Sequence, residues 1–306
     1  MAARPLREGA LGVVDPVHRE TLRQALDACF GRAAVDGLVP LAVGASAGAI
    51  LRVDSGGRRY LLRIEGPRSP LRYPHQYEAL RMAAEAGVAP PVFHVDEAAG
   101  VAVTGFIESW PLRTYPGGPV ALVRAVGQLL RRLHDSPPVP VFVPYPEIVA
   151  RLFAHVRRTG LFAAGLLDPH WERLERLRAA YDSDPADAVS CHNDSLPSNL
   201  LFDGERLWLV DWESAYPNDP LVDIAIQLDN TARSPALAEA LLHAWLGRAP
   251  DRAVSHRLEQ ARALNRLYYA GVLLSASADR APTAHALGKL YLHGFLTGEP
   301  VPPMPQ

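Results

Sequence analysis

The sequence predicts an α+β protein with two lobes, a small β-rich N-terminal lobe and a larger, mostly helical C-terminal lobe. Short apolar runs separated by turn residues dominate the early part of the chain, which is typical of a sheet. Helical periodicity dominates after Glu108, apart from one polar motif between two short strands. A chain of 306 residues is long enough for two lobes with sizeable cores. We expect residues 1–108 to form the first lobe and residues 109–306 the second.

The N-terminal lobe is expected to begin with an amphipathic helix, because Val17, Leu22 and Leu26 fall on one side of such a helix. A second helix is expected to end at Gly87, since glycine followed by prolines is a typical helix stop. The expected elements are, in order, a helix over residues 15–30, strands over 38–46, 49–54 and 59–65, a helix over 73–86, and strands over 92–95 and 101–106.

The C-terminal lobe is expected to be helical on both sides of a short strand pair. The pair is indicated by two apolar runs that flank the turn-forming dipeptide Asp203-Gly204. The expected elements are helices over residues 120–134, 145–158 and 169–181, strands over 200–202 and 207–211, and almost continuous helix from 219 to about 296.

The bulk composition excludes several classes of protein. The formal net charge is -2, so there is no electrostatic case for nucleic acid as a partner. Cys29 and Cys191 lie far apart and offer neither a metal-binding spacing nor a disulfide framework. The first residues lack the apolar core of a signal peptide, and no apolar run approaches the length of a membrane span. We therefore expect a cytoplasmic protein that has no membrane partner.

The segment CHNDSLPSNLLFDGERLWLVDWE, residues 191–213, carries the most informative functional pattern of the chain. It places Asp194, Asn199 and Asp211 at the ends of two short apolar runs. ATP-dependent phosphoryl transfer needs one carboxylate that orients and deprotonates the attacking hydroxyl, and an amide and a second carboxylate that hold Mg²⁺ against the phosphates. We therefore assign Asp194 as the catalytic base, and Asn199 and Asp211 as Mg²⁺ ligands.

Each of these residues taken alone is most often a turn or cap residue, and the strand–turn–strand pattern between them is what favours the functional interpretation. His192 is expected to be a packed, hydrogen-bonded anchor of the loop and not a proton carrier. Cys191 is expected to be a small buried residue, because nothing near it in the sequence would lower the pKa of its thiol.

The motifs HNDSLPSN, at residues 192–199, and DWESAYPNDPLVDIA, at residues 211–225, resemble the choline/ethanolamine kinase family within the aminoglycoside-phosphotransferase-like small-molecule kinases. The family pattern is His-x-Asp-x-x-x-x-Asn, then Asp-Trp-Glu, then Asn-Asp-Pro and Asp-Ile/Leu-Ala, and all four pieces are present in order. The resemblance implies a two-lobed protein-kinase-like fold with ATP and Mg²⁺ as cofactors. It also implies that Glu213 lies at the metal or acceptor site and that Asp223 supports the catalytic loop.

The same resemblance locates a phosphate-binding residue in the N-terminal lobe. Arg63 occupies the position at which most kinases carry a lysine, and choline-kinase-like sequences often have arginine there. An arginine is always charged and grips phosphate oxygens with two parallel N–H groups. Glu78 is the expected ion-pair partner of Arg63, and Glu85 is the alternative.

The rest of the nucleotide site is less well marked. A small-residue turn allows a close approach of the backbone to phosphates, and one is expected at Gly44, Ser46 and Gly48. The family commonly has Gly-Gly and an Asn-containing turn there, which this chain lacks, so ATP and GTP both stay open as donors. Backbone groups of Phe106 and Glu108 are expected to meet the base in a hinge between the lobes.

The expected acceptor is a small-molecule alcohol, whose identity the sequence leaves open. A quaternary ammonium group is bound by aromatic faces and nearby carboxylates, and Tyr216 is the aromatic residue nearest the motif. We therefore expect Asp194, Glu213 and Tyr216 to contact the acceptor. The pair Tyr268-Tyr269 lies within a helical pattern, where an aromatic residue more often belongs to the core.

Other functions compete with a choline- or ethanolamine-kinase-like activity. An aminoglycoside or other antibiotic phosphotransferase needs an acidic acceptor pocket, and the tail over 278–306 has just Asp279 and Glu299 as acidic residues. A thiamine-type kinase stays open, as does the oligomeric state. A nucleotide-binding pseudokinase is the rival from another class, and the intact Asp194, Asn199 and Asp211 argue against it.

Overall fold

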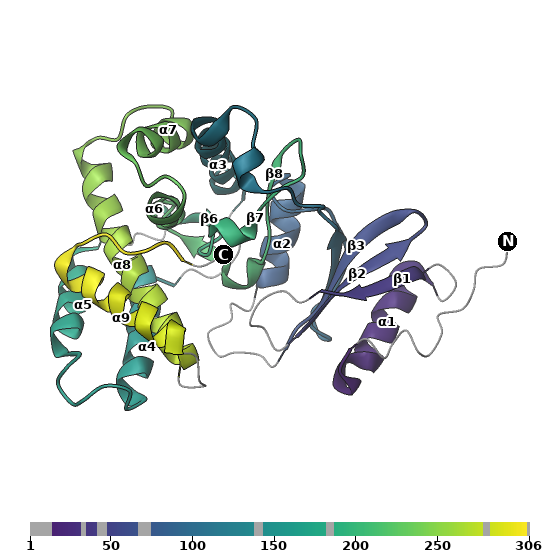
Figure 1. Cartoon of the computed structure of the whole chain (residues 1–306), viewed down its shortest axis with the longest axis horizontal. Coiled ribbons are helices and arrows are strands. Elements are labelled where there is room, and N and C mark those ends of the chain that lie inside the picture. Colours follow the sequence, from purple (N-terminus) through teal and green to yellow (C-terminus); the bar gives the residue numbers. More distant parts are fainter. Residues whose placement is uncertain are drawn as a thin grey trace.

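The computed structural model describes residues 14–31, 35–41, 48–66, 75–137, 143–181, 187–277 and 282–304. These residues form two lobes, with the sheet and α1 on the right of Figure 1 and most helices on the left. The architecture matches the α+β class that the sequence predicts. In the described part of the chain, none of the helices combines the length and the apolar character that crossing a membrane requires.

The N-terminal lobe contains a five-stranded antiparallel sheet in the order β1-β2-β3-β5-β4. Its strands are β1 (Val35–Pro40), β2 (Ala49–Ser55), β3 (Arg58–Ile64), β4 (Val92–Asp96) and β5 (Val101–Gly105). Side chains alternate across a strand, so Leu62 and Ile64 of β3 pack into the core beneath α1 (Arg19–Phe30). The same alternation turns Leu61 and Arg63 to the opposite face, where they line a cavity.

The helix α2 (Gln76–Glu85) lies on the side of the sheet away from α1, next to the helical lobe (Figure 1). Its buried residues Tyr77, Leu80 and Ala83 belong to the core of the helical lobe and not to the smaller core under α1. Packing of α2 thus connects the sheet to the helical lobe.

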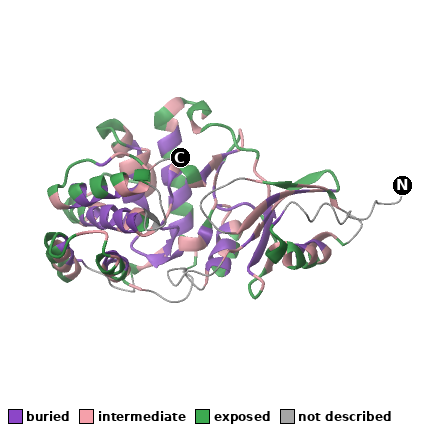
Figure 2. Cartoon of the chain, turned by 60° about the horizontal axis from the view of Figure 1, so that its bottom comes forward, coloured by how far each residue is buried: buried purple, intermediate pink, exposed green. Residues whose placement is uncertain are grey.

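Buried residues fill the centre of the C-terminal lobe in Figure 2. The lobe contains α3 (Gly118–His134), α4 (Tyr145–Arg158), α5 (Asp168–Ala180), α6 (Leu221–Asn230), α7 (Pro235–Leu246), α8 (Arg252–Ser277) and α9 (Pro282–Thr297). The long helix α8 contacts α4, α6 and α9. All residues over 221–228 of α6 are buried, as expected of a helix that crosses a core, and they include Asp223.

Two short strand pairs lie between these helices and carry the motif. The hairpin of β7 (Leu200–Phe202) and β8 (Leu207–Leu209) turns at Asp203, whose carboxylate accepts the N–H groups of the next turn residues. The sequence predicts this hairpin. A second antiparallel pair, β6 (Val189–Cys191) with β9 (Tyr216–Asn218), is not predicted, because the β7–β8 hairpin separates its two strands in the sequence and no local turn joins them.

Element boundaries differ modestly from the predictions. The first helix begins as a 3₁₀ turn, Pro16–His18, before α1. The first strand starts at Val35 and not at residue 38, and the predicted stretches 42–46 and 73–74 lie outside the described residues. The long helical region after 219 is four helices, α6 to α9.

Candidate active site

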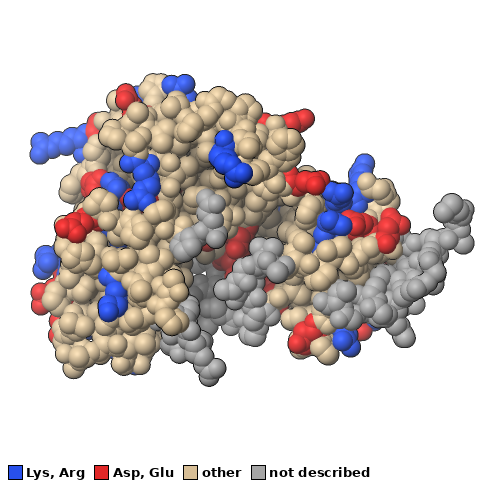
Figure 3. Space-filling view, viewed as in Figure 1, with Lys and Arg blue, Asp and Glu red and all other residues tan. Residues whose placement is uncertain are grey.

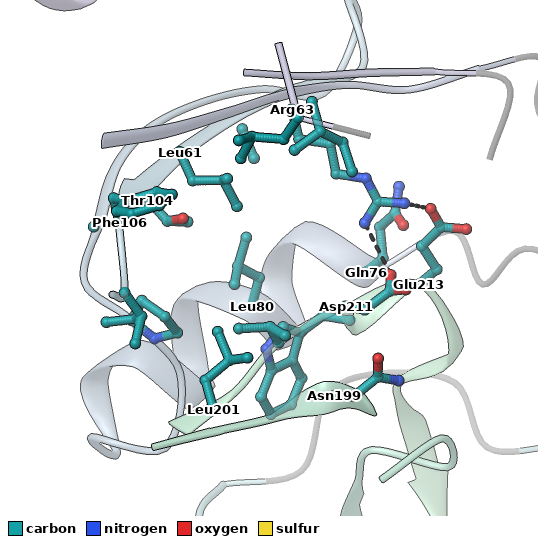
Figure 4. Close-up of a pocket in the computed structure, with 18 of the residues that line it drawn as sticks. Leu61, Arg63, Gln76, Leu80, Thr104, Phe106, Asn199, Leu201, Asp211 and Glu213 are labelled. Carbon is teal, nitrogen blue, oxygen red and sulfur yellow. Dashed lines mark hydrogen bonds and ion pairs between the residues drawn. The ribbon is translucent and has the colours of Figure 1, made fainter. Parts of the chain in front are cut away.

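A cavity of about 510 Å³ lies between the sheet, α2 and the β7–β8 hairpin (Figure 4). Apolar residues form most of its wall, and polar ones gather at one end. The apolar ones include Ile50, Leu61, Leu80, Ala102, Leu201, Val210 and Trp212; the polar ones include Arg63, Glu65, Gln76, Asn199, Asp211 and Glu213. Figure 3 shows acidic atoms in the hollow between the two lobes. Such a cavity suits a ligand with one flat apolar part and one charged part.

Asp194 follows β6 and is held by hydrogen bonds on both carboxylate oxygens. Tyr269 Oη donates to its Oδ1 at 3.1 Å, and Asn199 Nδ2 donates to its Oδ2 at 3.0 Å. Burial raises the pKa of Asp194 to about 7, the negative charge of Asp211 adds to the rise, and the two hydrogen bonds oppose it. A carboxylate with a pKa close to neutrality is suited to take a proton from a substrate hydroxyl.

The loop that carries Asp194 is anchored by Asp223, whose side chain is 0% exposed. The backbone N–H groups of His192 and Asn193 each donate to the Asp223 carboxylate at 2.8 Å. Burial alone would raise the pKa of Asp223, but the hydrogen bond from His134, the nearby histidines and the backbone N–H groups hold it below its usual range. Asp223 therefore stays ionised and supports the loop, as the family resemblance implies.

His134 of α3 lies behind Asp223 and is fixed in one tautomer. Trp245 Nε1 is a donor and never an acceptor, and it lies 2.9 Å from His134 Nδ1, so Nδ1 accepts this hydrogen bond. The ring proton is therefore on Nε2, which lies 3.2 Å from the Asp223 carboxylate. The ligand atoms of His134, Cys191 and Asp223 lie within 4.8 Å of one another. A protonated Nε2 has no lone pair for a metal, so this group is a structural anchor.

His192 and Cys191 are buried, as predicted. His192 Nε2 lies 3.0 Å from the carbonyl oxygen of Val210, and its ring packs edge-on against Trp212 with 4.7 Å between centroids. Burial lowers the pKa of His192, which favours the neutral ring. Burial raises the pKa of the Cys191 thiol, which makes it a poor nucleophile.

Two residues of the site have left-handed backbone conformations. Within the described ranges, Asn193 (φ 61°) and Asp211 (φ 67°) are the non-glycine residues with positive φ. Asn and Asp tolerate this region better than other side chains, and such strain gathers at functional sites. Asn193 offsets the strain through its side chain, which donates to the carbonyl oxygens of Ser214 (3.0 Å) and Tyr216 (3.1 Å).

Asn199, Asp211 and Glu213 form a set of oxygen donors at one end of the cavity. The β7–β8 hairpin brings the first two together, because the N–H of Val210 donates to the carbonyl oxygen of Asn199 at 3.0 Å. Asn199 Nδ2 is used by Asp194, so its amide oxygen is turned toward the cavity (Figure 4). One amide and two carboxylates are the hard oxygen ligands that Mg²⁺ prefers, so the donor set fits this ion.

Arg63 reaches from β3 to these carboxylates (Figure 4). Its guanidinium pairs with Asp211 Oδ1 at 3.0 Å and with Glu213. The prediction that Glu78 or Glu85 is its partner is wrong. Gln76, Leu80 and Ala83 form the buried face of α2, so Glu78 and Glu85 point to a different cavity, and Glu78 lies beside His75. Instead, α2 is tied to β3 by Gln76 and Tyr77, which both donate to Glu65.

The remaining residues of the predicted nucleotide site differ in their surroundings. Phe106 lines the cavity together with Ile107, whereas Glu108 is not a lining residue and pairs with Arg59 at 2.7 Å. Gly48 packs against the end of β3, where an added Cβ would lie 2.2 Å from the carbonyl oxygen of Ile64. Gly44 and Ser46 lie outside the described residues.

Asp194 contacts an aromatic residue that the sequence assigns to the core. Tyr216 is buried in β9 and accepts a hydrogen bond from Asn218 Nδ2 at 3.4 Å. Tyr269 is 4% exposed, as expected of a core residue, yet its phenol contacts Asp194. Tyr268 lies beside it, with 5.5 Å between ring centroids, and its phenol is hydrogen-bonded to Ser214. A helical spacing cannot reveal such contacts, since Tyr269 and Asp194 are 75 positions apart.

The half-buried carboxylate of Asp194 lies next to a set of oxygen donors that suits Mg²⁺, and Arg63 of the other lobe pairs with this set. This arrangement defines a phosphotransferase site on a protein-kinase-like fold. The comparison with protein families agrees. Residues 37–256 match the phosphotransferase enzyme family, APH, and the chain belongs to this family.

Three individual proteins are similar to this chain in sequence or in structure. LicA of Haemophilus influenzae is 29% identical over 203 residues, which cover 60% of this chain and 58% of that protein, little more than half of its length. A choline/ethanolamine kinase family protein from Mesorhizobium loti has a similar structure, with a TM-score of 0.69 and 28% identity over 91% of this chain and 92% of that one. Choline kinase LicA from Streptococcus pneumoniae shares the fold, with a TM-score of 0.72 and 14% identity over 92% and 100% of the two chains.

Proposed function

We propose that this protein is an ATP-dependent small-molecule O-phosphotransferase that phosphorylates an alcohol hydroxyl, with choline or ethanolamine as the acceptor. The observation that carries the proposal is the arrangement of Asp194, Asn199 and Asp211. The amide of Asn199 holds the Asp194 carboxylate beside the donor set. Asp211 directly follows Val210, whose N–H donates to the carbonyl oxygen of Asn199.

In the proposed reaction, Asp194 orients the acceptor hydroxyl for in-line attack on the γ-phosphorus of ATP. The new P–O bond forms to the acceptor oxygen, the bond from the γ-phosphorus to the β–γ bridging oxygen breaks, and the hydroxyl proton passes to Asp194. Mg²⁺, held by Asn199, Asp211 and Glu213, would neutralise charge on the phosphates. The remaining work of the protein is positioning and electrostatic stabilisation.

Arg63 is the proposed phosphate-binding residue. It lines the same cavity as the donor set and is the cation of its polar end. Its guanidinium forms ion pairs with Asp211 and Glu213. Phosphate oxygens can bind the guanidinium in the same bidentate way as the carboxylates do. When the nucleotide binds, Arg63 can therefore pair with its phosphates while Asp211 and Glu213 bind Mg²⁺.

The acceptor proposal rests on the aromatic surroundings of Asp194 and on the names of the similar proteins. Tyr268 and Tyr269 lie on the helix that crosses behind the carboxylate. Aromatic faces beside a carboxylate attract a cationic head group such as a quaternary ammonium. A choline/ethanolamine kinase family protein is among the structures most similar to this chain over nearly its full length, which supports the same acceptor class.

The proposed division of labour follows the sequence: residues 1–108 bind the nucleotide, and residues 109–306 carry the catalytic loop and bind the acceptor. An enzyme that consumes ATP is proposed to work in the cytoplasm, where this donor is made.

The direct test is acceptor-dependent release of ADP from Mg·ATP with choline, ethanolamine, thiamine, aminoglycosides, macrolides and simple sugars, each beside the Asp194→Asn variant as a blank. We expect release with choline or ethanolamine that the variant lacks. A strong response to an antibiotic or to thiamine would overturn the acceptor class. Nucleotide binding without turnover on any acceptor would favour a pseudokinase.

A further inference from the structure

Tyr269 stands out among the buried tyrosines because its phenol contacts a residue of the proposed active site. It lies within α8, is 4% exposed, and donates to Asp194 Oδ1 at 3.1 Å. Asn199 Nδ2 donates to the other oxygen, Oδ2, at 3.0 Å. Donors from two elements that are distant in sequence thus hold the two oxygens of one carboxylate.

Two such donors restrict the carboxylate more than one does. The terminal torsion of an Asp side chain is broad, so a carboxylate with a single hydrogen bond can still rotate. A donor on each oxygen fixes the plane of the group and leaves the remaining lone pairs in defined directions. Burial and the charge of Asp194 raise the pKa of Tyr269 well above its ordinary value, so the phenol keeps its proton and stays a donor.

The phenol is itself rigidly placed. The ring of Tyr269 packs edge-on against Tyr268 and Tyr291, with centroid distances of 5.5 and 6.2 Å. Tyr291, on α9, donates to the carbonyl oxygen of Pro302 at 2.9 Å. A group held on a packed helix is placed more accurately than one on a loop.

We propose that Tyr269 is a positioning residue for the transfer reaction: its phenol holds the Asp194 carboxylate in the orientation that receives the acceptor hydroxyl. The inference rests on the proposed function. It assigns to α8, which is remote from the motif in sequence, a direct part in aligning the reaction. A misplacement of about 1 Å can reduce a rate by about 100-fold, so alignment of the base has a measurable effect.

The test is the Tyr269→Phe variant, which removes one oxygen atom and keeps the ring. The matched control is Tyr291→Phe, which loses a partly buried phenol hydrogen bond in the same aromatic cluster but no contact with Asp194. We expect kcat of Tyr269→Phe to fall about 10- to 100-fold, while KM for the nucleotide and the melting temperature stay close to those of the control. A kcat within twofold of the control, or a parallel loss of nucleotide binding, would overturn the proposal.

A second measurement reports the hydrogen bond independently of turnover. The antisymmetric carboxylate stretch of Asp194 can be isolated in infrared spectra by subtracting the spectrum of Asp194→Asn. It should shift in Tyr269→Phe and stay unchanged in Tyr291→Phe, and an unshifted band in both would overturn the proposal. If the wild-type protein turned over no acceptor, the proposed function would be refuted as well. If the wild type turned over normally and Tyr269→Phe had an unchanged kcat, this inference alone would be refuted.

Discussion

The catalytic loop that carries Asp194 and the strand that carries Arg63 both contribute to the proposed site, yet their polar groups find partners in different places. Asp223 and Ser214, both in the C-terminal lobe, hold the loop through the backbone of His192 and Asn193 and the side chain of Asn193. Arg63 instead pairs across the cavity with Asp211 and Glu213. The loop is therefore fixed by groups of its own lobe, whereas Arg63 is held by two carboxylates of the other lobe.

This difference suggests how the two lobes share the proposed reaction. Chemistry needs groups whose positions are fixed in advance, because reorganisation at the moment of reaction costs free energy. Donor binding and release need contacts that exchange. Variants that change one of the two regions should therefore differ in their effects.

Asp223→Ala should have the largest effect, because it removes the partner of two backbone N–H groups and of His134 in a fully buried place. Breaking a buried charged network costs about 3–5 kcal/mol, so we expect the free energy of unfolding to fall by about that much and turnover to be lost. Urea unfolding measures the first and ADP release the second. Asp168→Ala, which breaks the exposed pair with Arg157, is the control and should cost less than about 1 kcal/mol. Equal costs would refute the anchoring role.

Arg63→Ala should weaken nucleotide binding by about tenfold or more while the fold stays intact, since a hydrogen bond to a charged group contributes about 1.5–3 kcal/mol. Calorimetric titration with Mg·ATP measures the affinity. Arg59→Ala is the control, because Arg59 lies on the same strand but pairs with the exposed Glu108. If both variants bound the nucleotide like the wild type, Arg63 would not be a phosphate-binding residue.

The pH profile examines the loop side of the comparison. Only the ionised carboxylate of Asp194 accepts a proton, and its pKa is raised to about 7. For an acceptor that does not titrate, kcat/KM should therefore fall about tenfold per pH unit below pH 7 and level off above it. A flat profile down to pH 5 would contradict this assignment of the base.

Glu78→Gln should have the smallest effect, with nucleotide affinity and kcat within about twofold of the wild type, because Glu78 contacts His75 on the far side of α2. The sequence-based expectation that Glu78 is the ion-pair partner of Arg63 implies a loss of nucleotide affinity instead. The same calorimetric titration separates the two outcomes.

Local features of the site could be predicted from the sequence, whereas contacts between distant elements could not. The β7–β8 hairpin is local, with an Asp-Gly turn between apolar runs, so the closeness of Asn199 and Asp211 follows from the pattern. The partners of Arg63 and the contact between Tyr269 and Asp194 depend on how distant elements pack, which periodicity does not encode. The left-handed backbone of Asn193 is likewise stabilised by tertiary hydrogen bonds, which its residue type alone does not reveal.

The most direct test of the central claim is to observe the phosphate ester itself. ³¹P NMR of choline or ethanolamine incubated with Mg·ATP should show the ester signal growing with the wild-type protein and absent with Asp194→Asn. The variant should still bind Mg·ATP with an affinity within a few-fold of the wild type, since Asp194 does not line the cavity that is proposed to hold the nucleotide. Ester formation by Asp194→Asn at the wild-type rate would contradict the account.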